Sequence, residues 1–238
     1  AFNLMEMVGL CSHRRKLIAL VVVAIIVAMF SGFVSAEEGE ILVVSETVTA
    51  EFPQGISFGI SIESPTPIND VRVHYNSVAT DITTYAVLEF EPGTKVDAHF
   101  LLDAGGQSGG LASFVPVGST IEYHFEVSNE AGENKVTAPQ KFLYLDSRFE
   151  WDHVSEGPIT VYHYGPTEKR ANDILQASLQ AVDRMSLVLG LEEVSPINVV
   201  AYNNYRHMVV ALPSRPQAIS EDLVTEGQAF SGLGVVMM

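Results

Sequence analysis

The chain has 238 residues, of which 47% are hydrophobic and 18% are charged, and its 13 Lys and Arg against 29 Asp and Glu give a formal net charge of −16. This composition is typical of a globular protein, and the length allows two modest domains. So strong an acidic balance repels phosphate backbones and anionic lipid head groups, which argues against nucleic-acid binding and against adhesion to a membrane surface. The single cysteine, Cys11, excludes an internal disulfide framework.

Residues 1–36 have the pattern of an export segment. A basic stretch at residues 13–16 precedes an apolar run at residues 17–30, and small residues follow up to Ala36. This order predicts a signal peptide cleaved after Ala36. The uncharged stretch 17–36 is also about long enough to cross a bilayer as a retained anchor, so both alternatives stay open. In either case we expect the remainder outside the cytoplasm, secreted or anchored to the cell membrane.

Residues 41–146 alternate apolar and polar side chains between short turn segments, which predicts an antiparallel sandwich. The segment 121–127 with the turn after it resembles the penultimate strand and hairpin of fibronectin type III domains. The predicted fold of this part is therefore all-β and immunoglobulin-like or fibronectin type III-like. The expected strands are residues 41–50, 55–63, 70–76, 84–90, 95–103, 120–129 and 135–144.

Three histidines of this part are expected on its polar faces. His74, His99 and His124 alternate with inward apolar residues, so the preferred interpretation is that they are solvated strand residues. A surface metal site formed by His74, His124 and Glu122 would require their two strands to be neighbours in one sheet. The glycine-rich stretch 105–110 lacks a lysine and opens no helix, which indicates a loop and not a phosphate cradle.

Residues 147–238 change to a mixed pattern. A strand is expected at 159–165, and an amphipathic helix is expected from Thr167 as N-cap to Gly190. A strand at 196–202, a short helix at 205–212 and a terminal strand at 234–238 follow. This order predicts a partial α+β domain. Because the chain stops within an apparently buried strand, we expect this domain to be truncated.

Short segments of this second part carry a family resemblance. They are residues 148–151, 157–162, 187–190, 196–202, 227–230 and 234–236. Together they resemble the N-terminal portion of the peptidase MA-like domains of exported bacterial proteins. That family consists of zincin-type metallopeptidases, in which an export segment and a β-sandwich often precede the peptidase domain. The resemblance implies that residues 147–238 are zincin-like in fold.

The resemblance implies a zinc metallopeptidase acting on peptide or protein substrates in the full-length protein. The chemistry of that family needs a His-Glu-x-x-His helix, in which two histidines hold zinc and the glutamate activates water. This sequence contains no such motif, so no catalytic or metal residue can be assigned, and we expect this chain alone to be inactive and to bind no zinc. Only a substrate-binding sheet edge is implied, at Gly234, Val235, Val236 and Met237.

Other polar residues of the second part have structural interpretations. His153 with Glu156 is expected in an extended linker, and His163 is expected to be partly exposed on a strand. Ser186 and Ser231 lack the setting of a nucleophilic serine. The alternative function is a non-enzymatic extracytoplasmic binding or adhesion module.

Overall fold

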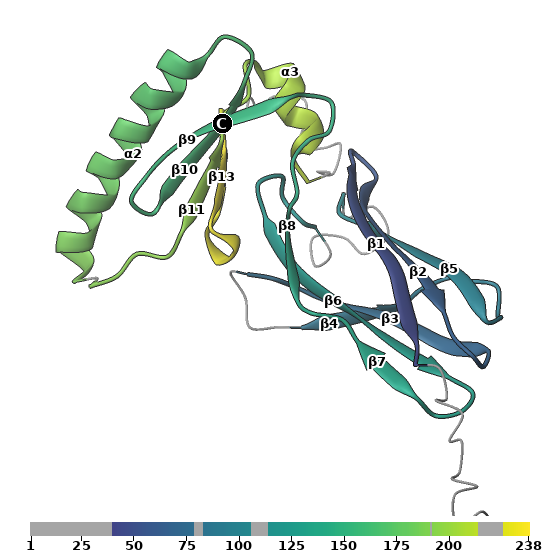
Figure 1. The fold of residues 1–238 in the computed structure, drawn as a ribbon. Helices are drawn as coiled ribbons and strands as arrows, with labels where there is room; N and C mark the ends of the chain where they lie inside the picture. Colours follow the sequence, from purple (N-terminus) through teal and green to yellow (C-terminus); the bar gives the residue numbers. More distant parts are fainter. Residues whose placement is uncertain (1–39, 79–82, 106–113, 191, 214–225) are drawn as a thin grey trace, which may run out of the picture. The chain divides into compact units, whose positions relative to one another are not determined.

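The computed structural model describes residues 40–78, 83–105, 114–190, 192–213 and 226–238, and residues 40–238 form one compact unit. The predicted export segment, including Ala36, lies outside the described residues. Within the described ranges the chain is mainly β, with three sheets and two α-helices (Figure 1). This confirms the mixed, mainly β composition expected from the sequence. No helix of the described ranges is long and apolar enough to cross a membrane.

The first sheet is antiparallel and has the strand order β1-β2-β5. It consists of β1 (Leu42–Glu51), β2 (Gly55–Glu63) and β5 (Lys95–Asp103). In β2 every second side chain is buried, including Phe58 and Ile60, because one face of the sheet covers the core. These three strands are close to the bounds expected from the sequence.

The second sheet is also antiparallel and has the order β4-β3-β6-β7. It consists of β4 (Thr84–Val87), β3 (Ile68–Ser77), β6 (Thr120–Asn129) and β7 (Asn134–Val136), and β8 (Gln140–Leu143) pairs with another part of β6. The single strand predicted at residues 135–144 is therefore two strands. Pro139 interrupts it because proline has no N–H to donate to the ladder.

Aromatic side chains join the inward faces of these two sheets. The ring of Phe58 in β2 stacks on Tyr75 in β3 at 6.0 Å between centroids and meets the edge of Tyr123 in β6 at 5.5 Å. Phe58 and Phe125 are fully buried among the aliphatic residues of the same core cluster. Burial of this apolar surface is the main source of stability for the two sheets.

The third sheet combines parallel and antiparallel strands in the order β12-β13-β11-β10-β9. Its strands are β9 (Trp151–Glu156), β10 (Ile159–Tyr164), β11 (Ile197–Val200), β12 (Gln228–Phe230) and β13 (Val235–Met237). β10, β11 and β13 run parallel, and β9 and β12 are the antiparallel outer strands. The stretch around His153, expected as a linker, is thus strand β9.

Helix α2 (Glu168–Leu189) lies along one face of this sheet (Figure 1). Ala171 and Leu175 of the helix pack with Val161 and Val199 of the sheet in one cluster. The next residue along β11, Val200, faces the other way and belongs to the core that includes the first two sheets. Both faces of the third sheet are therefore covered at its inner strands, which explains why β10, β11 and β13 are mainly apolar whereas the outer strand β9 is largely polar and exposed.

The predicted helix is confirmed, and Gly190 ends it in the left-handed conformation, with φ 65°. Thr167 occupies the N-cap position, but its hydroxyl makes no capping hydrogen bond. Instead, the Thr167 hydroxyl donates to the carbonyl of Tyr164. The short helix α3 (Tyr205–Met208) follows β11 and is capped by the side chain of Asn204, which accepts from the His207 N–H.

A buried carboxylate lies where the chain passes from the second sheet to the third. Asp146 is fully buried, and its Oδ2 accepts hydrogen bonds from Arg148 Nη2 at 2.6 Å and from the Tyr202 hydroxyl at 3.0 Å. Its backbone carbonyl accepts from Trp151 Nε1 at 2.8 Å. Burial and the neighbouring Asp146 raise the pKa of Tyr202 far above its usual value. The phenol is therefore a permanent donor.

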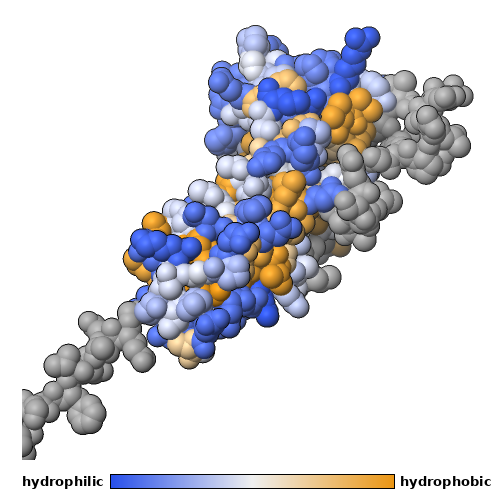
Figure 2. Space-filling view, turned by 90° about the vertical axis from the view of Figure 1, so that its right-hand side faces the viewer, coloured by the Kyte–Doolittle hydropathy of each residue, from blue (hydrophilic) through white to orange (hydrophobic). Residues whose placement is uncertain are grey.

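On the face drawn in Figure 2, hydrophilic residues are interspersed with separate groups of hydrophobic ones. Elsewhere on the surface, the last turns of α2 expose apolar side chains, and Leu187 is 86% exposed and Val188 is 78% exposed. These residues lie beyond the part of the helix that packs on the sheet. The repeat of apolar residues along α2 therefore continues beyond the part of the helix that packs on the third sheet.

Replacing the buried carboxylate should strongly destabilise the protein. Asp146→Ala leaves the Arg148 charge and the Tyr202 hydroxyl without their partner, and we expect the free energy of unfolding to fall by about 3 to 5 kcal/mol. Urea unfolding followed by Trp151 fluorescence measures the change. Asp173→Ala, which removes the exposed i,i+4 pair with Lys169, is the control and should leave the unfolding midpoint unchanged. Equal effects of the two variants would contradict this account.

Candidate functional site

A cleft of about 430 Å³ opens where strands of the second sheet end beside the third sheet. One wall comes from the end of β3 and the start of β6, including Val78 and Thr120. The other wall comes from the segments that lead into β11 and β13, including the short 3-10 helix Ser231–Leu233. The volume lies within the range of about 300 to 1,000 Å³ that is usual for small-molecule sites.

The described residues that line this cleft include no ionisable side chain. Its polar side chains include Thr120, Ser195, Asn198 and Ser231, and its apolar ones include Val78, Pro196, Ile197 and Leu233. Within the described part of the chain, no hydrogen bond engages the hydroxyls of Thr120, Ser195 or Ser231. These hydroxyls can both donate and accept. We call this site the neutral cleft.

Backbone geometry at two glycines holds the walls of the neutral cleft together. The Asn198 side-chain amide donates to the carbonyl of Gly118 at 2.8 Å, and the Asn198 N–H donates to the carbonyl of Gly234 at 2.8 Å. Gly118 has φ +98°, and a Cβ there would lie 2.6 Å from Val200 Cγ2. Gly118 is therefore required both by its conformation and by the close approach of the third sheet.

The outward face of the second sheet brings together two of the three histidines of the first part, whereas His99 lies on β5 of the first sheet. β3 and β6 are neighbours, and His74 and His124 lie directly opposite each other with their rings stacked at 4.8 Å. His74 Nε2 lies 2.9 Å from Glu126 Oε2, so Glu126 and not Glu122 is its carboxylate partner. The described residues nevertheless contain no group of three or more His, Cys, Asp or Glu placed to hold a metal ion.

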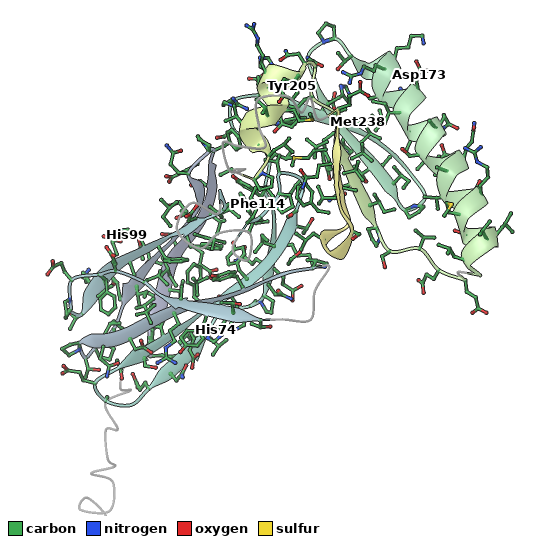
Figure 3. The ribbon with its side chains drawn as sticks, turned by 180° about the vertical axis from the view of Figure 1, so that it is seen from behind. His74, His99, Phe114, Asp173, Tyr205 and Met238 are labelled. Carbon is green, nitrogen blue, oxygen red and sulfur yellow. The ribbon has the colours of Figure 1, made fainter. Side chains whose placement is uncertain are left out.

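A smaller hollow of about 210 Å³ lies at the carboxyl ends of the parallel strands. Tyr205 and Met238, labelled in Figure 3, are among the residues that line it. Arg170 also lines it, but Arg170 Nη1 already donates to the carbonyl of Tyr202 at 3.0 Å. The guanidinium therefore holds the start of α2 to the segment after β11, which is a structural role.

The remaining predicted residues are dispersed. His153 lies on the outer strand β9, Ser186 lies in α2, and Ser231 lies at the neutral cleft. His163 is only 3% exposed, so its predicted partial exposure was wrong. Its Nδ1 lies 3.2 Å from the Thr167 hydroxyl, which donates to Tyr164 and is thus free to accept from this ring.

The segment Gly234, Val235, Val236 and Met237 is an interior part of the third sheet. β13 pairs with β11 on one side and with β12 on the other. Its backbone groups are therefore engaged on both sides, and the outer strand at this end of the sheet is β12. Gly234 contributes to the neutral cleft.

Sequence reasoning missed the neutral cleft. Its residues lie in short stretches of small and polar residues at 194–198 and 231–234, just before two parallel strands. Because the starting ends of parallel strands meet at one edge of a sheet, those stretches could have been expected side by side. The contribution of Val78 and Thr120 could not have been expected, since it depends on how the second and third sheets pack.

Comparisons with known proteins give matches only among solved structures. No protein-family model matches the chain, and no curated protein matches it. A crystal structure of a family 56 carbohydrate-binding module, described as a β-1,3-glucan-binding domain, has 15% sequence identity and a TM-score of 0.25. The match covers 44% of this chain and 99% of that one. A family 64 laminaripentaose-producing β-1,3-glucanase from Paenibacillus barengoltzii has 16% identity and a TM-score of 0.25, over 49% of this chain and 27% of that one.

These findings correct the predicted resemblance to peptidase MA-like metallopeptidases. No protein-family model supports it. The metallopeptidase function and the peptide or protein substrate were therefore wrong predictions. The physical reason is that the resembling segments at 157–162, 196–202 and 234–236 supply the buried strands β10, β11 and β13. Apolar strands of this kind occur in any sheet that is covered on both faces.

Gly118 offers a test of how the walls of the neutral cleft are held. Gly118→Ala forces a side chain into a left-handed conformation and against Val200, so we expect the free energy of unfolding to fall by about 1 to 3 kcal/mol. Gly232→Ala is the matched control, because a Cβ at Gly232 meets nothing within 4 Å. Chemical denaturation of both variants measures the difference. An unfolding midpoint for Gly118→Ala equal to that of the control would contradict the assignment.

Proposed function

We propose that this protein is a non-enzymatic extracytoplasmic binding module that takes a neutral carbohydrate into the neutral cleft. The observation that carries the proposal is that the described residues lining this cleft are all without an ionisable side chain, in a chain whose net charge is −16. Such a lining offers no cation to pair with an anionic ligand and no carboxylate to pair with a cationic one. It favours a ligand that is polar but uncharged.

The mixed lining supports carbohydrate as the ligand class. A sugar ring presents hydroxyl groups around its rim and C–H groups on its faces. The hydroxyls of Thr120, Ser195 and Ser231 can exchange hydrogen bonds with the rim. Val78 and Leu233 offer apolar contact to the faces. A small number of polar groups among apolar ones is the usual composition of a small-molecule site.

The finer organisation is part of the same proposal. Residues 41–146 would form an immunoglobulin-like or fibronectin type III-like sandwich, and residues 147–238 a second domain that supplies the other wall of the cleft. The two antiparallel sheets and their shared aromatic core support the first assignment. The change at Asp146 from antiparallel sheets to a mixed sheet with a covering helix supports the boundary.

Binding of neutral oligosaccharides to the full chain tests the ligand class. Titration calorimetry with a panel of β-1,3-, β-1,4- and α-1,4-linked glucose oligomers should show 1:1 binding of at least one member, with a Kd between about 10 μM and 1 mM. Polygalacturonate should not bind. Because the described lining residues carry no charge, the affinity should be insensitive to salt.

Two glycine variants place the ligand in the cleft. Gly232→Leu adds a side chain in open space at the cleft, so it should fold normally and weaken binding at least about tenfold by occupying the site. Gly93→Leu is the matched control: a Cβ there meets only ordinary contacts, at 3.6 Å and beyond, and Gly93 does not line the cleft. If no neutral oligosaccharide binds, or if Gly232→Leu binds as well as Gly93→Leu, the proposal is wrong.

Export is tested separately from binding. The basic stretch at residues 13–16 should remain in the cytoplasm, so a phosphatase reporter fused after Met238 should be active outside it. Mass spectrometry of the exported product then distinguishes a new N-terminus at Glu37 from a retained anchor. A reporter that is active only in the cytoplasm would overturn the predicted localisation.

A further inference from the structure

The stacked pair His74 and His124 lies on two strands that also build the neutral cleft. The two residues are directly opposed in the β3–β6 ladder, and their ring planes differ by only 1° at a centroid distance of 4.8 Å. The Tyr85 ring of β4 lies 5.8 Å from His74 on its other side. Three aromatic rings thus form a row across adjacent strands, with the histidine pair at its centre.

The charges around this pair are unevenly divided between the two rings. Glu126 lies 2.9 Å from His74 Nε2, and its other oxygen accepts from the Asn134 side chain. The His74 ring is therefore paired with a carboxylate. His124 makes no hydrogen bond to another residue in the described ranges. The other charged or titratable groups on the same sheet face are Asp70 and Arg72 of β3, which form an ion pair, Tyr85 of β4, Glu122 of β6 and Lys141 of β8.

The position of His124 opposes its protonation. Burial lowers the pKa of His124, the charge of the opposed His74 lowers it further, and Glu126 and Glu122 offset only part of this effect. In the unfolded chain the imidazole has its ordinary pKa. The lowered pKa therefore makes the folded state depend on a neutral His124. Its contribution to folding stability is complete above the unfolded pKa of about 6.5. It is lost as the pH falls below that value, because the unfolded state then binds more protons than the folded state.

The β3–β6 ladder connects the histidine pair to the cleft. From His74 and His124 the pairing continues to Ser77 and Ile121, and then the Val78 N–H donates to the Thr120 carbonyl at 2.9 Å. Val78 and Thr120 both line the neutral cleft. A repulsion that separates β3 from β6 at the histidines therefore acts on the strand pair that forms one wall of the site.

We infer that the His74–His124 pair is an acid-sensitive joint that weakens the β3–β6 ladder, and with it the neutral cleft, when both rings carry a proton. The ligand part of this inference rests on the proposed function. The joint itself depends only on the opposed rings and the charges around them. Acidification would then release the ligand although the described residues that line the cleft do not titrate.

The stability of the full chain without ligand tests the joint. We expect the urea midpoint of the unaltered protein to fall more between about pH 7.5 and pH 5 than that of His124→Gln, which cannot take the second proton. His74→Gln should remove only part of this extra loss, because it takes away the opposed ring but leaves His124 buried. His99→Gln is the matched control: His99 is exposed on β5, 3.9 Å from Glu89, and should leave the pH dependence unchanged.

Ligand affinity tests the consequence for the cleft. With the glucose oligomer that binds best at pH 7.5, the Kd of the unaltered protein should rise about three- to tenfold by pH 5, and the Kd of His124→Gln should rise less. An equal fall in urea midpoint for the unaltered protein and His124→Gln would overturn the joint. Equal pH dependence of their Kd values, with different midpoints, would overturn the link to the cleft. Absence of any oligosaccharide binding at pH 7.5 would count against the proposed function alone, since the urea midpoints still judge the joint.

Discussion

The buried carboxylate of Asp146 holds together parts of the chain that are far apart in sequence. It follows the last strand of the second sheet, and through the Tyr202 hydroxyl it fixes the segment after β11. Arg148 extends the network, because its Nη2 also donates to the carbonyl of His207 in α3 at 2.9 Å. The guanidinium packs over the ring of Phe52, 4.5 Å from its centroid. A fully buried carboxylate such as Asp146 is tolerated only where it is paired and hydrogen-bonded, and here Arg148, whose side chain stays one-third exposed, and Tyr202 supply these bonds.

This network also determines where the neutral cleft can form. Once Tyr202 is fixed, β11 is placed so that Val200 packs against Gly118 and Asn198 reaches the Gly118 carbonyl. The turn containing Gly118 leads into β6, whose first residue, Thr120, lines the cleft. The cleft is therefore a result of how two covered sheets meet, and no local sequence motif specifies it.

Local patterns in the sequence were sufficient for most elements. The alternation in β2, β5 and β6 and the period of α2 each report one buried face, so their bounds could be predicted closely. β9 was missed because a short outer strand such as Trp151–Glu156 buries little and carries a weak alternation. The burial of His163 was missed because alternation alone cannot show that a helix covers that face of β10.

The functional predictions failed for a related reason. Short apolar strand segments report burial on both faces, and burial is shared by many unrelated sheets, so they cannot identify a family chemistry. The pairing of His74 with His124 could not be derived from the sequence, because it depends on which strands are neighbours. The alternation of apolar and polar residues in the sequence did show correctly that the side chains of His74 and His124 lie on the outward face. Register then adds what alternation cannot: it sets which outward residues meet, and here it brings two titratable rings together on the strand pair that ends at the cleft.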